Sequence, residues 1–105
     1  MNNITISGLQ RYIKAKDYHP ERKKDYFLKL AEEVGELARA LLGNAPPADE
    51  ATFKGSVEEE IYDIIYYALA IANICDIDVE KWIPVKEHLN DIKYGRQDAD
   101  KLFDY

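Results

Sequence analysis

The segments KLAEEVGELARALL at residues 29–42 and SVEEEIYDIIYYALAIANI at residues 56–74 decide the fold of this chain. Residues three apart lie on the same face of an α-helix, so acids at that spacing mark one side of a helix. Each segment carries one such pair of carboxylates: Glu33 with Glu36, and Glu60 with Asp63. Two neighbouring helices of this kind would bring four carboxylates together.

The first acid pair belongs to a helix that we predict over residues 20–42. Pro20 suits a first helical turn, and Gly43 followed by Asn44 suits a helix end. Its expected buried stripe recurs at helical spacing and consists of Phe27, Leu30, Val34, Leu37 and Leu41. Glu33 lies roughly 40° from this stripe, and Glu36 follows on the same side.

The second acid pair belongs to a helix that we predict over residues 57–75. Isoleucine, leucine and alanine surround this helix almost completely, which is typical of the centre of a core or of an oligomer interface. Two ionised carboxylates on an apolar helix are costly unless they are paired or bind metal. Glu60 and Asp63 are therefore the strongest candidates for a functional role.

Two neighbouring acids have simpler explanations. Glu32 falls about 100° further round the helix than Glu33, toward solvent, so it ranks as a weaker metal ligand. Glu59 stands three residues after Ser56, the spacing of a capping box at a helix N-terminus.

The remaining sequence predicts a single domain over residues 1–105. Further helices are expected over residues 5–16 and 79–93, the second containing Pro84, which implies a kink or a restart. Residues 44–55 read as a loop, and residues 96–105 as a possible C-terminal arm. We therefore expect an all-α bundle of about four helices that completes its core as a homo-oligomer, either a dimer or a tetramer.

Composition excludes several classes of partner. The net charge of −6 disfavours binding to a nucleic acid polymer or to an anionic membrane. No apolar run approaches the ~20 residues that cross a bilayer, and the N-terminus lacks the pattern of a signal peptide. Cys75 is the only cysteine and lies in the apolar run IANIC, so we expect it to be buried in a cytoplasmic protein.

Four facing carboxylates form a cluster of oxygen donors that repels itself when it is empty. Hard cations relieve this repulsion, so we expect Mg²⁺, with Mn²⁺ as a possible substitute, and an anionic substrate bound through the metal. A helical di-iron site is excluded because it needs Glu-x-x-His pairs. The residues three before His19 and His88 are Lys16 and Val85.

These acids resemble a known family. Glu32-Glu33-x-x-Glu36, followed after 23 residues by Glu60-x-x-Asp63, is similar to the EExxE…ExxD signature of MazG-like, all-α nucleotide pyrophosphohydrolases. The similarity is strong over residues 26–75, including the wording EEVGELA and EEIYDIIYYALAIA.

A second part of the chain also resembles this family. Lys86-x-x-x-Asn90-x-x-Lys93-Tyr94 is similar to its K…N..RY helix, with Lys93 where arginine is frequent. Lys86, Asn90 and Lys93 share one helix face. Pro84, just upstream, departs from the family pattern.

The resemblance implies hydrolysis of a nucleoside triphosphate, NTP or dNTP, to the monophosphate and pyrophosphate, as in house-cleaning enzymes. It implies Glu33, Glu36, Glu60 and Asp63 as catalytic metal ligands, in a site that a neighbouring subunit completes. Phosphate would be bound by Lys86, Asn90, Lys93 and, as a weaker candidate, Lys29, and His19 is a candidate for contacting the base. Two alternatives remain open: a phosphoribosyl-ATP pyrophosphohydrolase, and a noncatalytic helical oligomer that binds metal or nucleotide.

Overall fold

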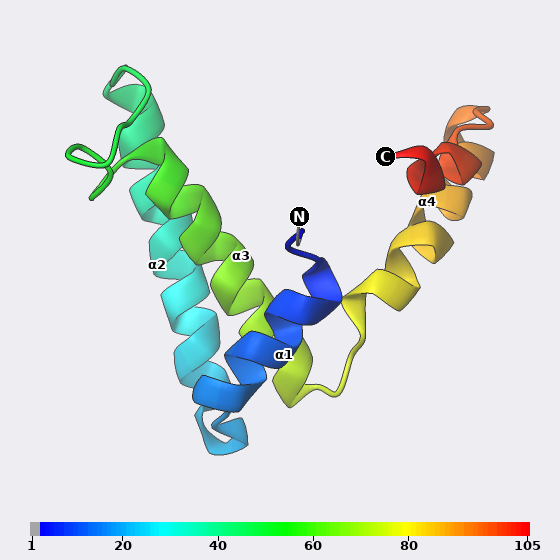
Figure 1. Cartoon of the computed structure of the whole chain (residues 1–105), viewed down its shortest axis with the longest axis horizontal. Coiled ribbons are helices and arrows are strands. Elements are labelled where there is room, and N and C mark those ends of the chain that lie inside the picture. The colour runs from blue at the N-terminus through cyan, green and yellow to red at the C-terminus, as the bar shows by residue number, and fades with distance from the viewer. Residues whose placement is uncertain (1–2) are drawn as a thin grey trace.

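The computed structural model describes residues 3–105, and within them the chain forms helices and no strand. The helices are α1 (Ile6–Lys16), η1 (Pro20–Arg22), α2 (Lys23–Leu42), α3 (Val57–Ile74), α4 (Val79–Tyr94) and η2 (Ala99–Asp104), of which η1 and η2 are 3₁₀-helices. The elements form a V: α2 and α3 make one arm, and α4 with η2 makes the other (Figure 1). The prediction of an all-α fold with about four main helices is confirmed.

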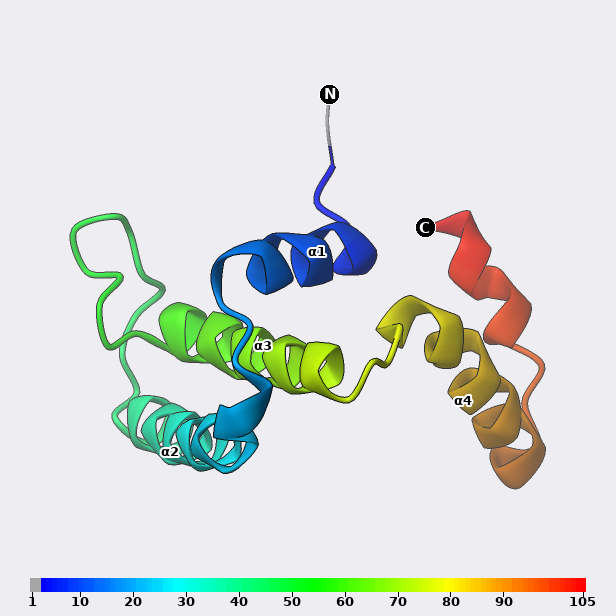
Figure 2. The same cartoon turned by 90° about the horizontal axis from the view of Figure 1, so that it is seen from below.

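The helix α3 is the centre of the assembly, because α1 and α2 pack on opposite sides of it (Figure 2). The small core lies at the foot of the V, where these three helices meet. It consists of Ile13, Tyr26, Leu69 and Ala70, which are all buried.

The predicted helix boundaries hold to within a few residues. Residues 20–22 form the separate 3₁₀ turn η1 before α2 begins at Lys23, so the predicted helix starts as two pieces. Asn44, rather than Gly43, takes the left-handed conformation after α2, with φ 53°. The helix α4 continues through Pro84 without a restart and ends at Gly95, a left-handed cap with φ 65°.

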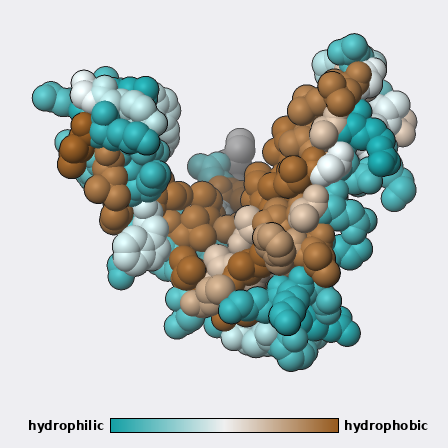
Figure 3. Space-filling model, turned by 180° about the vertical axis from the view of Figure 1, so that it is seen from behind, coloured by the Kyte–Doolittle hydropathy of each residue, from teal (hydrophilic) through white to brown (hydrophobic). Residues whose placement is uncertain are grey.

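The expected buried stripe of α2 is only half right. Phe27, Val34 and Leu41 are 60%, 51% and 55% exposed, whereas Leu30 and Leu37 are half-buried against α3. The apolar band of α2 is wider than the contact with one helix, and its outer half has no helix of the same chain beside it. Figure 3 shows the resulting apolar surface along the arm of α2 and α3.

The second arm also presents apolar side chains to solvent. The helix α4 has no buried residue among those described. Trp82, Val85, Leu89 and Ile92 are spaced so that they share one face, and each is at least 44% exposed.

Cys75 is exposed, so the expectation of a buried thiol is wrong. The reason is its position as the C-terminal cap of α3, where the chain turns away from the apolar foot of the V. No described helix is both long and apolar enough to span a membrane.

Asp17 ties the end of α1 to both helices of the first arm. The hydroxyl of Tyr26 on α2 donates to Asp17 Oδ1 at 2.5 Å, and the hydroxyl of Tyr66 on α3 donates to Oδ2 at 2.6 Å. These two hydrogen bonds hold the pKa of Asp17 below its ordinary value. Burial and the hydrogen bond to Asp17 raise the pKa of Tyr26 to about 12.

We expect Asp17→Asn to lower the free energy of unfolding by about 1–2 kcal/mol at neutral pH, because hydrogen bonds to a charged acceptor are replaced by neutral ones. A lowered pKa stabilises the fold above the pKa of the unfolded chain. The difference from the parent therefore shrinks as the pH falls below about 4. Urea unfolding at several pH values measures it, with Asp25→Asn, an exposed acid of α2, as the control. A difference that persisted at acid pH would contradict this role of the Asp17 charge.

Candidate active site

Three carboxylates meet between α2 and α3. One oxygen each from Glu33, Glu60 and Asp63 lie within 4.8 Å of one another. The two helices run antiparallel, so the acid-bearing face of α2 meets the acid-bearing first turns of α3. The sequence prediction that these acids from two helices come together is therefore correct for these three residues.

Glu60 is the most enclosed member of the cluster. Glu60 is only 5% exposed, and its Oε2 atom has no hydrogen-bond partner among the described residues. A buried carboxylate oxygen normally has at least one donor, because an unpaired one is costly. The local structure therefore leaves a place that a cation or a proton can occupy.

The first turn of α3 is fixed by its caps, and these orient Glu60. Ser56 Oγ accepts a hydrogen bond from the Glu59 backbone N–H at 3.1 Å, as the capping box predicts. The Glu59 side chain accepts a hydrogen bond from the Gly55 N–H at 2.8 Å, whereas in a complete capping box it would accept one from the Ser56 N–H. Glu58 accepts from the Ala48 N–H at 2.8 Å and so holds the preceding loop. The carboxylates of Glu58 and Glu59 therefore hold the backbone before α3 and do not join the acid cluster.

The electrostatics of the cluster reflect crowding of like charges. The hydrogen bond that a protonated Glu33 makes with Glu60, together with burial and the neighbouring charges, raises the pKa of Glu33 to about 7. Burial and the charge of Glu33 raise the pKa of Asp63, while Lys54 opposes that change. Near neutral pH, a large fraction of the molecules therefore carry a proton on Glu33 when no cation is bound.

The other predicted ligands lie beside the three. Glu36 is half-buried, and its charge contributes to the raised pKa of Glu33. Its Oε2 accepts a hydrogen bond from Arg39 at 3.3 Å, so Glu36 lies at the rim of the cluster. Glu32 is exposed and pairs with Lys29 at 3.5 Å, which agrees with its lower rank in the sequence.

The donor set fits a hard divalent cation. All three atoms are carboxylate oxygens, neighbouring Glu36 could add a fourth, and no histidine or cysteine belongs to the group. Mg²⁺ and Mn²⁺ prefer oxygen ligands of this kind. A cation there would contact the Glu60 Oε2 atom, which has no hydrogen-bond partner among the described residues, and would offset the repulsion among the carboxylates.

A cavity of about 220 Å³ lies along the same two helices, toward the foot of the V. It is lined by Asp17, Arg22, Asp25, Tyr26, Lys29 and Tyr67. Lys29 and Tyr67 connect it to the acids, since the charges of Lys29, Glu33 and Asp63 all act on the Tyr67 hydroxyl. Sequence reasoning gave Tyr67 no role, although its position four residues after Asp63 puts it on the acid-bearing face.

Three of the four predicted phosphate-binding residues are not brought to the acids within one chain, whereas Lys29 lines the cavity beside them. Lys86, Asn90 and Lys93 lie on α4, in the opposite arm of the V (Figure 1). Asn90 Nδ2 donates to Glu87 at 3.2 Å, and Lys93 lies over the ring of Tyr94. His19 stands before η1 next to two acids, 3.8 Å from Asp17 and 3.5 Å from Glu21, outside the cavity lining.

Comparisons with known proteins identify relatives of this chain. A family model described as the MazG nucleotide pyrophosphohydrolase domain matches residues 21–92. A crystal structure of N-terminally tagged iMazG from Vibrio DAT 722 is 46% identical, with a TM-score of 0.79, and the match covers 89% of this chain and 100% of that one. The C-terminally tagged form is 45% identical, with a TM-score of 0.77 and coverage of 83% and 98%. The search of curated proteins found no match.

We expect Glu60→Gln to stabilise the metal-free protein by about 1–2 kcal/mol above neutral pH, because one of the repelling charges is removed. A carboxyl whose folded pKa is raised stabilises the fold below its unfolded pKa, and that contribution is lost as the pH rises through about 7. Thermal unfolding in EDTA should therefore show a parent that weakens between pH 5 and pH 8, and a variant that weakens less. Asp25→Asn, an exposed charge change on α2 that does not act on Glu33, is the control, and equal pH dependence of all three proteins would contradict the raised pKa of Glu33.

Proposed function

This chain belongs to the MazG nucleotide pyrophosphohydrolase family, a family of hydrolases that act on phosphoric anhydride bonds, and we propose that it binds its nucleoside triphosphate through Mg²⁺. Glu33, Glu60 and Asp63 would hold the cation, with Glu36 as the fourth ligand. The observation that carries the proposal is the buried Glu60 side chain, whose Oε2 atom has no hydrogen-bond partner among the described residues and whose carboxylate meets those of Glu33 and Asp63. Mn²⁺ is the expected substitute, and the cytoplasm is the expected compartment.

The proposed reaction adds water across the anhydride bond between the α- and β-phosphates and yields the monophosphate and pyrophosphate. When bound, the cation neutralises phosphate oxygens and lowers the pKa of a water. One carboxylate of the cluster, Glu36 or Glu33, would also orient the attacking water, and Glu36 lies half-buried at the edge of the cluster beside Arg39. The negative net charge of the chain makes a cation essential for binding so anionic a substrate.

The remainder of the nucleotide has space along the first arm. The 220 Å³ cavity begins beside Lys29 and Tyr67 and is lined by both charged and aromatic side chains. Lys29 can pair with phosphate, and the tyrosine rings offer flat surfaces for stacking. His19 remains a proposed contact to the base.

We infer that the site is completed by a second copy of the chain. Lys86, Asn90 and Lys93 each follow an apolar residue of the exposed α4 face, namely Val85, Leu89 and Ile92. If that apolar face packs on the exposed apolar surface of α2 and α3 in a neighbouring copy, the adjacent side chains of Lys86, Asn90 and Lys93 also lie close to that copy's first arm. The basic side chains would then bind phosphate in trans in a homo-oligomer.

Glu60→Gln and Asp63→Asn should each abolish pyrophosphate release while leaving the helical content unchanged, because each removes a charged cation ligand. The test is release of pyrophosphate from a panel of NTPs and dNTPs with Mg²⁺. Glu32→Gln, in the same stretch but exposed, should retain activity. Near-normal turnover by Glu60→Gln or Asp63→Asn would show that the altered residue is not a required cation ligand.

Completion in trans predicts recovery of activity on mixing. We expect Lys86→Ala to be inactive because it loses a phosphate-binding group, but this chain keeps its acids. Glu60→Gln keeps its α4, so hybrids of the two chains should contain some complete sites. The control mixture combines Glu60→Gln with Asp63→Asn, whose defects lie in the same cluster, and should remain inactive. An inactive first mixture, despite subunit exchange verified by native mass spectrometry, would rule out completion by a neighbour.

A further inference from the structure

The direction of α4 is fixed by polar contacts at its first turn. This helix has no buried residue in the described chain, and of its residues only the first, Val79, is half-buried against the core at the foot of the V. Apart from η2 at its far end, its main contacts are with α1. Whatever sets its angle must therefore act where α1, α3 and α4 meet.

Gln10 of α1 occupies that meeting point and is only 7% exposed. Its Nε2 donates to Asn73 Oδ1 at 3.1 Å and to the Ile77 carbonyl at 2.9 Å. Its Oε1 accepts from the Val79 N–H at 3.0 Å, and Asn73 Nδ2 donates back to the Gln10 carbonyl at 2.9 Å. One buried amide thus joins α1, α3, the linker and the beginning of α4.

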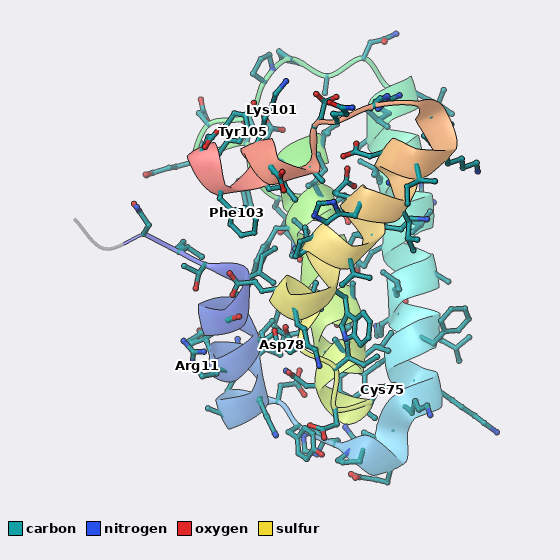
Figure 4. The ribbon with its side chains drawn as sticks, turned by 90° about the vertical axis from the view of Figure 1, so that its right-hand side faces the viewer. Arg11, Cys75, Asp78, Lys101, Phe103 and Tyr105 are labelled. Carbon is teal, nitrogen blue, oxygen red and sulfur yellow. The ribbon has the colours of Figure 1, made fainter. Side chains whose placement is uncertain are left out.

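The contact with Val79 replaces a missing cap. Asp78 stands at the N-cap position of α4, as the sequence predicts, but its side chain makes no capping hydrogen bond. Gln10 instead satisfies one of the free N–H groups that every helix N-terminus presents. Figure 4 labels Arg11 on α1, the residue after Gln10, and Asp78, the residue before the first turn of α4.

The capping is reciprocal. Glu80 Oε2, in the first turn of α4, accepts a hydrogen bond from the Ser7 N–H in the first turn of α1 at 2.7 Å. A carboxylate at a helix N-terminus also interacts favourably with the helix dipole. Each helix therefore supplies a side chain to the other's N-terminus. Because α4 is held at two separate positions along α1, it cannot pivot about one of them without breaking the other.

Backbone hydrogen bonds hold the linker between α3 and α4 in one conformation. The Ile77 N–H donates to the Ala72 carbonyl at 2.8 Å and the Asp76 N–H to the Asn73 carbonyl at 3.1 Å, which is the Schellman pattern. Asp76 takes the left-handed conformation with φ 56°. The chain therefore enters the Gln10 contact in a defined backbone conformation.

We propose that Gln10 and Glu80 are positioning residues, which set the angle of α4 and so place Lys86 and Asn90 against the acid cluster of a neighbouring copy. This inference rests on the proposed function and on completion of the site in trans. Neither residue touches the cluster, and α1 precedes the residues that match the family model. Their effect on catalysis would be transmitted only through the direction of α4.

The kinetic test uses full-length variants. Glu80→Ala removes an exposed contact with little risk to folding, and Gln10→Ala removes the buried one. Both should lower kcat/KM by about 10-fold or more, as expected when binding groups are misplaced. Glu80→Gln keeps an oxygen for the Ser7 N–H and should restore activity, and Tyr66→Phe, which removes a hydrogen bond at the other end of α1, should leave it unchanged.

Binding of Mn²⁺ alone, measured by electron paramagnetic resonance, separates this role from damage to the acids. Unchanged Mn²⁺ affinity in Glu80→Ala and Gln10→Ala supports the proposal. It is overturned if Glu80→Ala retains the parent kcat/KM, if Glu80→Gln is as impaired as Glu80→Ala, or if Mn²⁺ affinity falls along with activity.

A distance measurement distinguishes failure of this inference from failure of the proposed function. Spin labels at Ala51→Cys and Gln97→Cys, on a Cys75→Ser background, mark the loops at the tips of the two arms. One labelled chain diluted into unlabelled protein should give a narrow distance distribution, which Glu80→Ala and Gln10→Ala broaden and Glu80→Gln does not. An unchanged distribution overturns the positioning role whether or not the parent releases pyrophosphate.

Discussion

Repulsion among the carboxylates of Glu33, Glu60 and Asp63 is the constraint around which this structure is built. Packing α2 against α3 buries apolar side chains, but it also forces these oxygens to within 4.8 Å of one another. The hydrogen bond with Glu60, burial and the neighbouring charges raise the pKa of Glu33 to about 7, so this carboxyl holds a proton near neutral pH when no cation is bound. The arm is thus less stable than an apolar pair of helices would be, and in return it carries a candidate site for a cation.

The foot of the V offsets this local instability. Ile13, Tyr26 and Leu69 are buried there, and Asp17 ties three helices together through two short hydrogen bonds. Because these contacts lie toward one end of the first arm, the acid-bearing end can be strained without loss of the fold. The separation of a stable foot from a strained site is common in enzymes, where function and stability compete.

Under the proposed function, the two arms would carry complementary parts of a phosphate-binding site. The first arm would supply the oxygen ligands of a cation, while α4 would supply ammonium groups and an amide from one face. Both arms also expose apolar side chains that a lone chain leaves in water, such as Phe27 and Leu89. Burial of such surface between copies is the physical drive that would bring the two halves together.

The sequence by itself determined the helices, the acid pairs and the rank of Glu33, Glu60 and Asp63 over Glu32, because helical periodicity and the cost of charge on an apolar helix are local properties. It also placed the cap of α3 at Ser56. It misjudged Cys75 and the outer stripe of α2, since burial depends on which helices are neighbours and not on hydrophobicity alone. Only the tertiary structure decided that Glu36 lies at the rim, because this depends on how α2 packs against α3. Only the tertiary structure decided that α4 points away from the acids and that Gln10 caps it, because these follow from contacts between residues more than sixty positions apart.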